Sequence, residues 1–348
     1  MPEPLYVPVL ATRPHAAHAY RELRPAVQAA VAPLWTLPPR PGLQPDVLAA
    51  ALRRDLAVVS RVQRHRPAWL DAPFADGTET TALCEVLPQY WSLTPLRPVT
   101  GPGRPPAQQA AALASAASCG GGLGIRVRMT GEWLDGAVED VRALRDRADP
   151  AVCLDLLLDL AAVRADRPDA GKETLRALDA LIPLAPWRSV AVMAGGFPEL
   201  TAALVEQDLA EEPRTDWGLW HEIGASGRAY LPLLRYGDYG ILAPRALERT
   251  PSEGRGGPSW GVLRYTTQRS FLLCKVLTRG EDRAAVTRAA AGRLLGLDDF
   301  RGAGASAGEG WLRSCAQGAG PVGTGNHTVW NRVGNVQHMT YVVESLRI

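Results

Sequence analysis

The stretch AVCLDLLLDL, residues 151–160, decides the fold class of this chain. Apart from Asp155 and Asp159 it is apolar throughout, which is typical of a parallel strand buried on both faces. A parallel strand needs a long crossover to its neighbour, and that crossover is usually a helix. Helical patterns do flank this strand, in EWLDGAVEDVRALRDR (132–147) before it and GKETLRALDALIPL (171–184) after it.

The same alternation extends outward in both directions. Strand-like runs occur at 5–10, 32–37, 68–74, 96–100, 122–129, 151–160 and 188–195, with an eighth at 236–242, and helical runs at 14–31, 45–65, 79–91, 106–118, 132–147, 171–184 and 198–209. Seven β–α units followed by an eighth strand favour a closed (β/α)₈ barrel. The rival fold is an open doubly wound sheet, which usually shows a glycine fingerprint after its first strand. Here that place reads ATRPHA (11–16), with no glycine.

The pattern changes after residue 244. RTPSEGRGGPS (249–259) has the composition of a flexible loop. A β-hairpin is expected over 260–277, turning near Thr267 and Gln268, and helices over 282–297, 310–317 and 337–348. The sequence therefore predicts an α/β fold with a TIM-like (β/α)₈ barrel over residues 1–244. A C-terminal α+β elaboration, residues 245–348, is expected to pack on it.

Charge and cysteine content exclude some classes of protein. A net charge of +2 argues against a partner dominated by nucleic-acid electrostatics. The five cysteines form no CxxC pair, so a zinc knuckle is not expected. An odd number of cysteines without a secretion signal is typical of reduced thiols, and we expect a cytoplasmic protein. No apolar run approaches the ~20 residues of a membrane span.

The chain carries four short motifs: YVPVL near the N-terminus, RYGDYGIL (235–242), LRYTT (263–267) and WNRVGNVQHMTYVV (330–343). Together they resemble the beta protein family of bacterial and phage proteins. Their order and spacing cover nearly the whole chain. The resemblance implies an association with mobile elements or phage defence, and it implies no particular reaction.

The chain departs from the pattern that the resemblance implies at three places. A basic residue usual after the first strand is replaced by Leu10–Ala11, with Arg13 nearby, and an acid usual after the second strand by Thr36. The tail has Gln337–His338 where relatives tend to have two histidines. These changes favour a member whose chemistry is lost or altered.

Candidate site residues follow from the barrel, because active sites of this fold lie at the C-terminal ends of the strands. The expected catalytic acids are Asp71, Asp159 and Asp238, with Arg13, Arg126 and Arg128 as substrate-binding residues. One interpretation is ion pairs that only close the core. The other is recognition of an anion or sugar with acid–base help from an aspartate. No metal is expected, because no ligand spacing supports one.

The stretch HTVWNRVGNVQHMTYVV (327–343) raises a second expectation. Its polar residues are read as a loop over one barrel mouth, followed by a last helix that begins near His338. The hypothesis is a wall of the same cleft, built by His327, Trp330, Arg332 and His338 near Arg264, Tyr265 or Asp238. The alternative is a polar loop packed on the surface.

Two functions remain open from the sequence. The first is a binding or scaffold component of a bacterial phage-defence or mobile-element-associated system, with a protein partner. The alternative is an enzyme, a hydrolase or transferase, acting on a nucleotide, sugar or other anionic small molecule at the barrel mouth. No cofactor is expected in either case, since no P-loop, GxSxG or HExxH motif is present.

Overall fold

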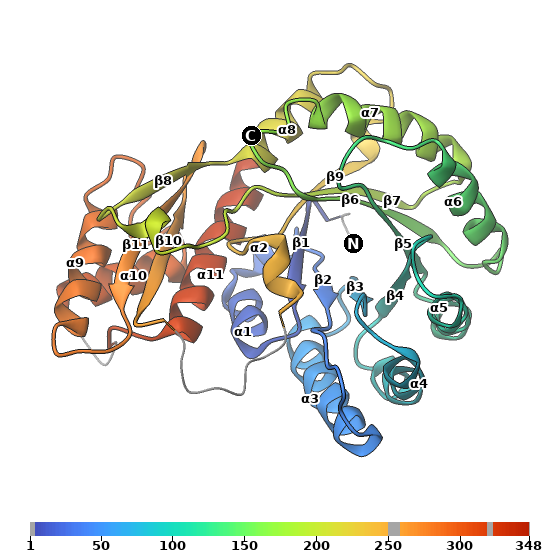
Figure 1. Cartoon of the computed structure of the whole chain (residues 1–348), viewed down its shortest axis with the longest axis horizontal. Coiled ribbons are helices and arrows are strands. Elements are labelled where there is room, and N and C mark those ends of the chain that lie inside the picture. The colour runs from blue at the N-terminus through green and yellow to red at the C-terminus, as the bar shows by residue number, and fades with distance from the viewer. Residues whose placement is uncertain (1–3, 250–257, 319–322, 348) are drawn as a thin grey trace.

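The computed structural model describes residues 4–249, 258–318 and 323–347. Eight parallel strands close into a barrel with helices around it, which confirms the predicted fold (Figure 1). In barrel order the strands are β1 (Tyr6–Ala11), β2 (Leu34–Thr36), β3 (Ala68–Asp71), β4 (Leu96–Thr100), β5 (Leu123–Arg128), β6 (Leu154–Ala162), β7 (Ser189–Gly195) and β9 (Leu234–Asp238).

Helices connect the strands on the outside of the barrel. They are α1 (Pro14–Glu22), α2 (Pro25–Gln28), α3 (Pro45–Gln63), α4 (Gly77–Val86), α5 (Pro106–Cys119), α6 (Gly136–Asp146), α7 (Ala170–Leu181) and α8 (Thr215–Gly224). Proline opens α1, α3 and α5, where its missing N–H costs nothing. Asp76 caps α4 by accepting a hydrogen bond from the Glu79 N–H at 2.8 Å.

The barrel interior is built in layers from alternate residues of each strand. Its middle layer is apolar and includes Val9, Leu34, Trp69, Val99 and Leu157, which belong to one buried cluster. Because side chains alternate between the faces of a strand, residues two positions away share the interior. Those positions hold Asp155 on one side of the apolar layer and Asp159 on the other. Charged layers thus lie above and below an apolar middle.

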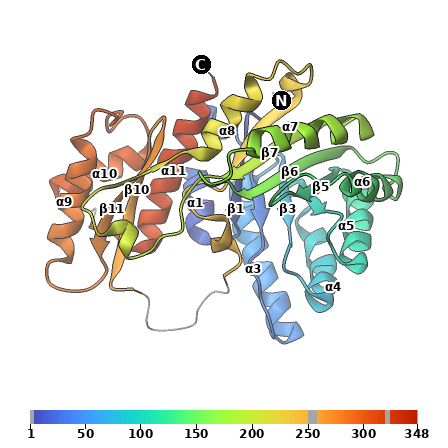
Figure 2. The ribbon, with the colours of Figure 1, turned by 45° about the horizontal axis from the view of Figure 1, so that its top comes forward.

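The C-terminal region forms a second body of structure beside the barrel. It contains the sheet β10-β11-β8, made by β8 (Ala210–Pro213), β10 (Trp260–Thr266) and β11 (Ser270–Leu277). The hairpin of β10 and β11 agrees with the predicted one. Helices α9 (Arg283–Leu295), α10 (Ala307–Gln317) and α11 (His327–Ser345) complete it. In Figures 1 and 2 α11 lies between this sheet and α1, and it contacts both.

The helix expected over 198–209 is wrong. The structure has only a short 3-10 turn, Ala203–Val205, followed by strand β8. Strand β8 pairs with β11 rather than with the barrel, although it precedes residue 244. Val205 packs in one buried cluster with Ala210, Phe271 and Leu273 of the C-terminal sheet. This tertiary contact overrides the helical propensity of an Ala- and Leu-rich segment.

The prediction of a tail loop before residue 337 is also wrong. Helix α11 begins ten residues earlier, where the Asn326 side chain accepts a hydrogen bond from the Val329 N–H at 3.1 Å. Its Val, Asn, Thr and Gly residues are weak helix formers, so the helix depends on burial. Val336 and Met339 join the core around α1 and α3, and Trp330 joins the core of the C-terminal sheet. The predicted flexible loop at 249–259 falls largely on residues outside the described part.

Candidate ligand site at the barrel mouth

Arg126 organises the charged layer at the C-terminal mouth of the barrel. Its Nη1 lies 2.6 Å from Oδ2 of Asp71, and its Nη2 lies 2.7 Å from Oδ2 of Asp159. The same Nη2 donates to the Tyr239 hydroxyl at 2.9 Å. Arg104 adds two hydrogen bonds from Nη2 to the carboxylate oxygens of Asp71, at 2.9 and 3.0 Å. Two arginines and two aspartates therefore balance in charge within one connected network.

Burial and pairing decide the protonation of this network. Burial by itself would raise the pKa of Asp159, but the Arg126 charge and hydrogen bonds from Tyr239 and the Ala161 N–H lower it below its ordinary value. The pKa of Tyr239 is raised by burial and by the Asp159 charge. Asp159 is thus held as a carboxylate and Tyr239 as a neutral phenol that donates to it.

A cavity of about 410 Å³ opens above this network. Its walls come from the loops after several strands, and the lining includes Thr36, Gly101, Arg104, Arg126, Arg128, Tyr239 and Glu248. Its volume falls in the range of small-molecule sites, about 300–1,000 Å³. Arg128 lies at the rim with its side chain 54% exposed, 3.2 Å from Glu248. It therefore has donors free to turn toward a ligand.

Thr36 gives the cavity an unsatisfied polar group. The residue is 1% exposed, lines the cavity, and its hydroxyl has no hydrogen-bond partner within the described structure. A buried polar group without a partner carries a free-energy cost. A ligand in the cavity would supply the missing partner.

Asp155 lies at the opposite end of the barrel and forms a separate cluster. Its carboxylate accepts from the Trp69 indole N–H at 2.9 Å and from Arg188 Nε at 2.9 Å, and Arg97 lies 3.2 Å away. None of these residues lines the mouth cavity. The cluster closes the opposite end of the barrel, which is called the floor below.

Asp238 lies away from the other two predicted acids. The sequence placed it near the start of the last strand, whereas it is the final residue of β9. It accepts hydrogen bonds from the Tyr6 hydroxyl at 2.5 Å and from the Gly240 N–H at 2.8 Å, and it pairs with His338 at 2.9 Å. The neighbouring Tyr239 points to the mouth instead. Asp238 therefore belongs to the outer wall of the barrel, under α11.

The pKa of Asp238 reflects this enclosure. Burial would raise it, but His338 and the Tyr6 hydroxyl lower it below the ordinary value. The other ring nitrogen of His338 lies 2.9 Å from the Thr266 hydroxyl. His338 is 0% exposed, so it joins the barrel wall, β10 and α11.

The remaining predicted residues lie at several places around α11. Trp330 donates to the Thr324 carbonyl at 2.8 Å, and His327 packs edge-on to its ring. Arg332 lies 3.4 Å from Glu22 of α1. The Tyr265 hydroxyl donates to the Asp299 carbonyl at 3.3 Å. Residues of this set do not line the mouth cavity.

Arg264 and Arg13 lie near the place where α1, β10 and α11 meet. Arg264 of β10 donates to Asn331 of α11 at 2.7 Å. Arg13, at the end of β1, donates to the Arg249 carbonyl at 3.3 Å. Neither residue lines the mouth cavity.

Two residues of the mouth were missed from the sequence. Arg104 sits in the proline- and glycine-rich loop GPGRPP (101–106), where no periodic pattern marks a position. Tyr239 lies one residue past the end of β9 and two residues after Gly237, so it continues the interior face of that strand. This two-residue spacing was the signal in the sequence that could have identified Tyr239 as a residue of the mouth.

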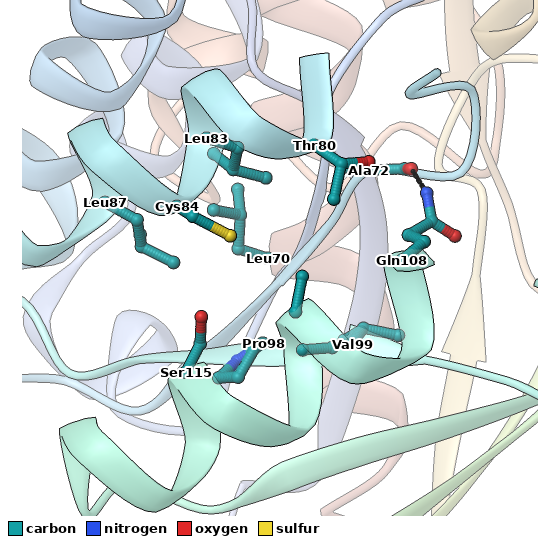
Figure 3. Close-up of a pocket in the computed structure, with 12 residues that line it drawn as sticks. Leu70, Ala72, Thr80, Leu83, Cys84, Leu87, Pro98, Val99, Gln108 and Ser115 are labelled. Atoms are coloured by element: carbon teal, nitrogen blue, oxygen red, sulfur yellow. Dashed lines mark hydrogen bonds between the residues drawn. The ribbon is translucent and has the colours of Figure 1, made fainter. Parts of the chain in front are cut away.

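A second hollow lies between α4 and α5 (Figure 3). Its volume is only about 40 Å³, and its lining is mostly apolar, with Leu70, Leu83, Leu87 and Val99 among the residues that contribute to it. Cys84 points its sulfur into it, and burial raises the pKa of that thiol. The hollow is too small for a metabolite.

Within the described residues, His, Cys, Asp and Glu side chains nowhere gather in threes in a way that would hold a metal ion. Among the helices in that same part of the chain, none combines the length and apolarity needed to cross a bilayer.

Comparison with known proteins assigns the chain to a family. No curated protein matches it in sequence. The crystal structure of a mandelate racemase/muconate lactonizing protein from Herpetosiphon aurantiacus aligns with a TM-score of 0.36 and 10% identity. The alignment covers 79% of this chain and 64% of that one, so it spans less than two thirds of that protein. The profile described as Beta protein matches residues 6–344, and the chain therefore belongs to the Beta protein family.

Proposed function

We propose that the protein binds a small anionic molecule at the mouth of its barrel. The observation that carries this proposal is the cavity of about 410 Å³, lined by Arg104, Arg126 and Arg128 together with the unpartnered hydroxyl of Thr36. Arginine suits phosphate and carboxylate groups because its planar fork donates two parallel hydrogen bonds. The site lies at the end of the barrel where such folds bind their ligands.

Binding is favoured over catalysis by the state of the two aspartates. A general acid or base works best with a pKa near the operating pH. Asp159 has a lowered pKa and is bonded to Arg126, Tyr239 and the Ala161 N–H, and Asp71 is bonded to two arginines. Both carboxylates therefore hold the arginines in place for a ligand. The alternative remains a hydrolase or transferase acting on a nucleotide or sugar at the same mouth.

The resemblance to other members of the family adds a biological expectation to the proposal. Ligand binding would serve a bacterial phage-defence or mobile-element-associated system in which a partner protein recognises the loaded barrel. A pull-down with and without ligand would test this partner directly.

The central experiment compares two buried threonines, of which one lines the cavity and the other does not. Thr36 and Thr100 are both fully buried with unpartnered hydroxyls, but only Thr36 lines the cavity. A thermal-shift screen with nucleotides and sugar phosphates identifies a ligand, because binding to the folded state raises the midpoint. Thr36→Val should weaken that ligand about tenfold, as expected for one lost hydrogen bond to a charged group. Thr100→Val should bind it as wild type does.

Both valine variants should be as stable as wild type without ligand, since neither hydroxyl has a partner to lose. Equal affinity in Thr36→Val and wild type, or a screen in which no anion raises the midpoint, would remove the proposal. Turnover of the ligand that Asp159→Asn abolishes would support the enzyme instead.

A further inference from the structure

Arg264 is a buried cation without a carboxylate. It is 8% exposed, and its Nη1 donates to the Val262 carbonyl at 3.2 Å and to the Asn331 side-chain oxygen at 2.7 Å. The ring of Phe197 lies 5.7 Å from the guanidinium carbon. Across residues 4–249, 258–318 and 323–347, no Asp or Glu pairs with it. Burial therefore lowers the pKa of Arg264 to about 10.

Three other buried arginines of this protein differ from Arg264 in having carboxylate partners. Arg40, Arg126 and Arg214 have side chains between 0% and 9% exposed, and each pairs with at least one carboxylate. Burying a charge is costly unless it is paired. Arg264 differs from these three arginines in having no carboxylate partner among the described residues.

The free part of Arg264 is the edge that recognises oxyanions. Its Nε is buried with no hydrogen-bond partner, and both of its hydrogen bonds are made by Nη1. The edge formed by Nε and Nη2 is thus unused within the described structure. That edge donates two parallel hydrogen bonds to a carboxylate or phosphoryl group.

The neighbours of Arg264 are cationic or neutral. The pKa of His15, in the first turn of α1, is lowered to about 4 by burial and by the charges of Arg13 and Arg264. Burial and the Arg264 charge also lower the pKa of His327, in the first turn of α11. His15 Nε2 is buried and unpartnered, and no side chain caps the N-terminus of α1. The first turn of a helix carries a positive partial charge.

We infer that Arg264 is the core of a second binding site, for an oxyanion, at the junction of α1, β10 and α11. One carboxylate or phosphoryl group bonds to the Nε–Nη2 edge, and the unpartnered His15 and the α1 N-terminus add donors. None of these residues lines the mouth cavity, so this inference is independent of the proposed function. The site joins the barrel to the C-terminal sheet, and its ligand therefore strengthens that junction.

The test measures the thermal midpoint of the full chain in sodium phosphate and in sodium malonate, each against sodium chloride at equal ionic strength. Phosphate, malonate or both should raise the midpoint of wild type in a concentration-dependent way, and the larger effect identifies the source of the oxyanion. Arg264→Met should abolish the rise. Because it removes an unpaired buried charge, it should be at least as stable as wild type in chloride.

The matched control is a buried threonine that belongs to neither site. Thr100→Val should keep the phosphate or malonate effect in full, and Arg264→Met should still bind the mouth ligand as wild type does, which separates this site from the proposed function. If Arg264→Met does not fold, His15→Gln decides, with at least a threefold weaker response expected. The inference is overturned if neither anion raises the wild-type midpoint, or if the rise persists undiminished in Arg264→Met or, failing that variant, in His15→Gln.

Discussion

The imidazole Nε2 of His338, in the middle of the last helix, lies 2.9 Å from Oδ2 of Asp238, although 100 residues separate them in the chain. The contact joins the final strand of the barrel to α11. The polar residue His338 of the tail therefore holds α11 against the barrel. The histidine is enclosed by Tyr6, Phe271 and Thr266 rather than by solvent.

Replacing His338 tests that contact. His338→Gln leaves Asp238 and Thr266 without their ring partner, and each buried unsatisfied group costs about 1–3 kcal/mol. Chemical denaturation should show a loss of unfolding free energy of at least about 1 kcal/mol. His65→Asn, at an exposed position, is the control and should lose less than about 0.5 kcal/mol. Equal losses in the two variants would contradict the assignment.

Removal of residues 325–348 should abolish cooperative folding. The deletion takes away α11, whose Trp330, Val336 and Met339 belong to two separate buried clusters. Loss of a large buried side chain typically costs about 2–5 kcal/mol, and several are lost together. Circular dichroism during heating would show no sharp transition. A truncated protein that still melts cooperatively would mean that the barrel folds without the helix.

Arg126 should be far more important for stability than Arg128. Arg126→Met leaves Asp71 and Asp159 as buried carboxylates with a lost partner, an effect of about 3–5 kcal/mol. Arg128→Met removes only an exposed pair with Glu248, worth about 0–1 kcal/mol. Urea titration of both variants gives the comparison. A small loss in Arg126→Met would show that the network is not held by this arginine.

The floor of the barrel should affect stability without affecting the ligand. Asp155→Asn weakens its bonds to Arg97 and Arg188 and should lower the unfolding free energy by more than about 1 kcal/mol. Affinity for the mouth ligand should stay within twofold of wild type, because the cluster lies at the other end of the barrel. Isothermal titration calorimetry measures this. A large loss of affinity would place Asp155 in the site.

Mild acid should destabilise the protein through His15. Its pKa is about 4 in the folded chain against about 6.5 when unfolded, so between these values the unfolded state binds the extra proton. Stability then falls as the pH drops from about 6.5 to 4, by about 3 kcal/mol at most. His15→Gln should flatten this part of a stability–pH profile in chloride buffer. A profile as steep in His15→Gln as in wild type would contradict this prediction.

Much of the fold could be predicted from the sequence because it depends on local periodicity. The apolar run around β6 and the regular return of strands and helices predicted the parallel barrel, and the hairpin over 260–277 followed from strand patterns alone. Part of the candidate site could be predicted from the sequence for the same reason. Asp71, Asp159 and Arg126 lie in the C-terminal halves of their strands, where residue parity points them inward.

The rest depended on contacts between distant segments. Strand β8 forms because β11, some sixty residues later, offers it an edge. Helix α11 extends to Asn326 because two cores bury its weakly helical residues. Asp238 and Tyr239 are adjacent in sequence, yet one faces His338 outside the barrel and the other faces Arg126 inside it. Local periodicity determines that neighbouring side chains diverge, but only the closed barrel and the helix packed on it decide which of them reaches the mouth.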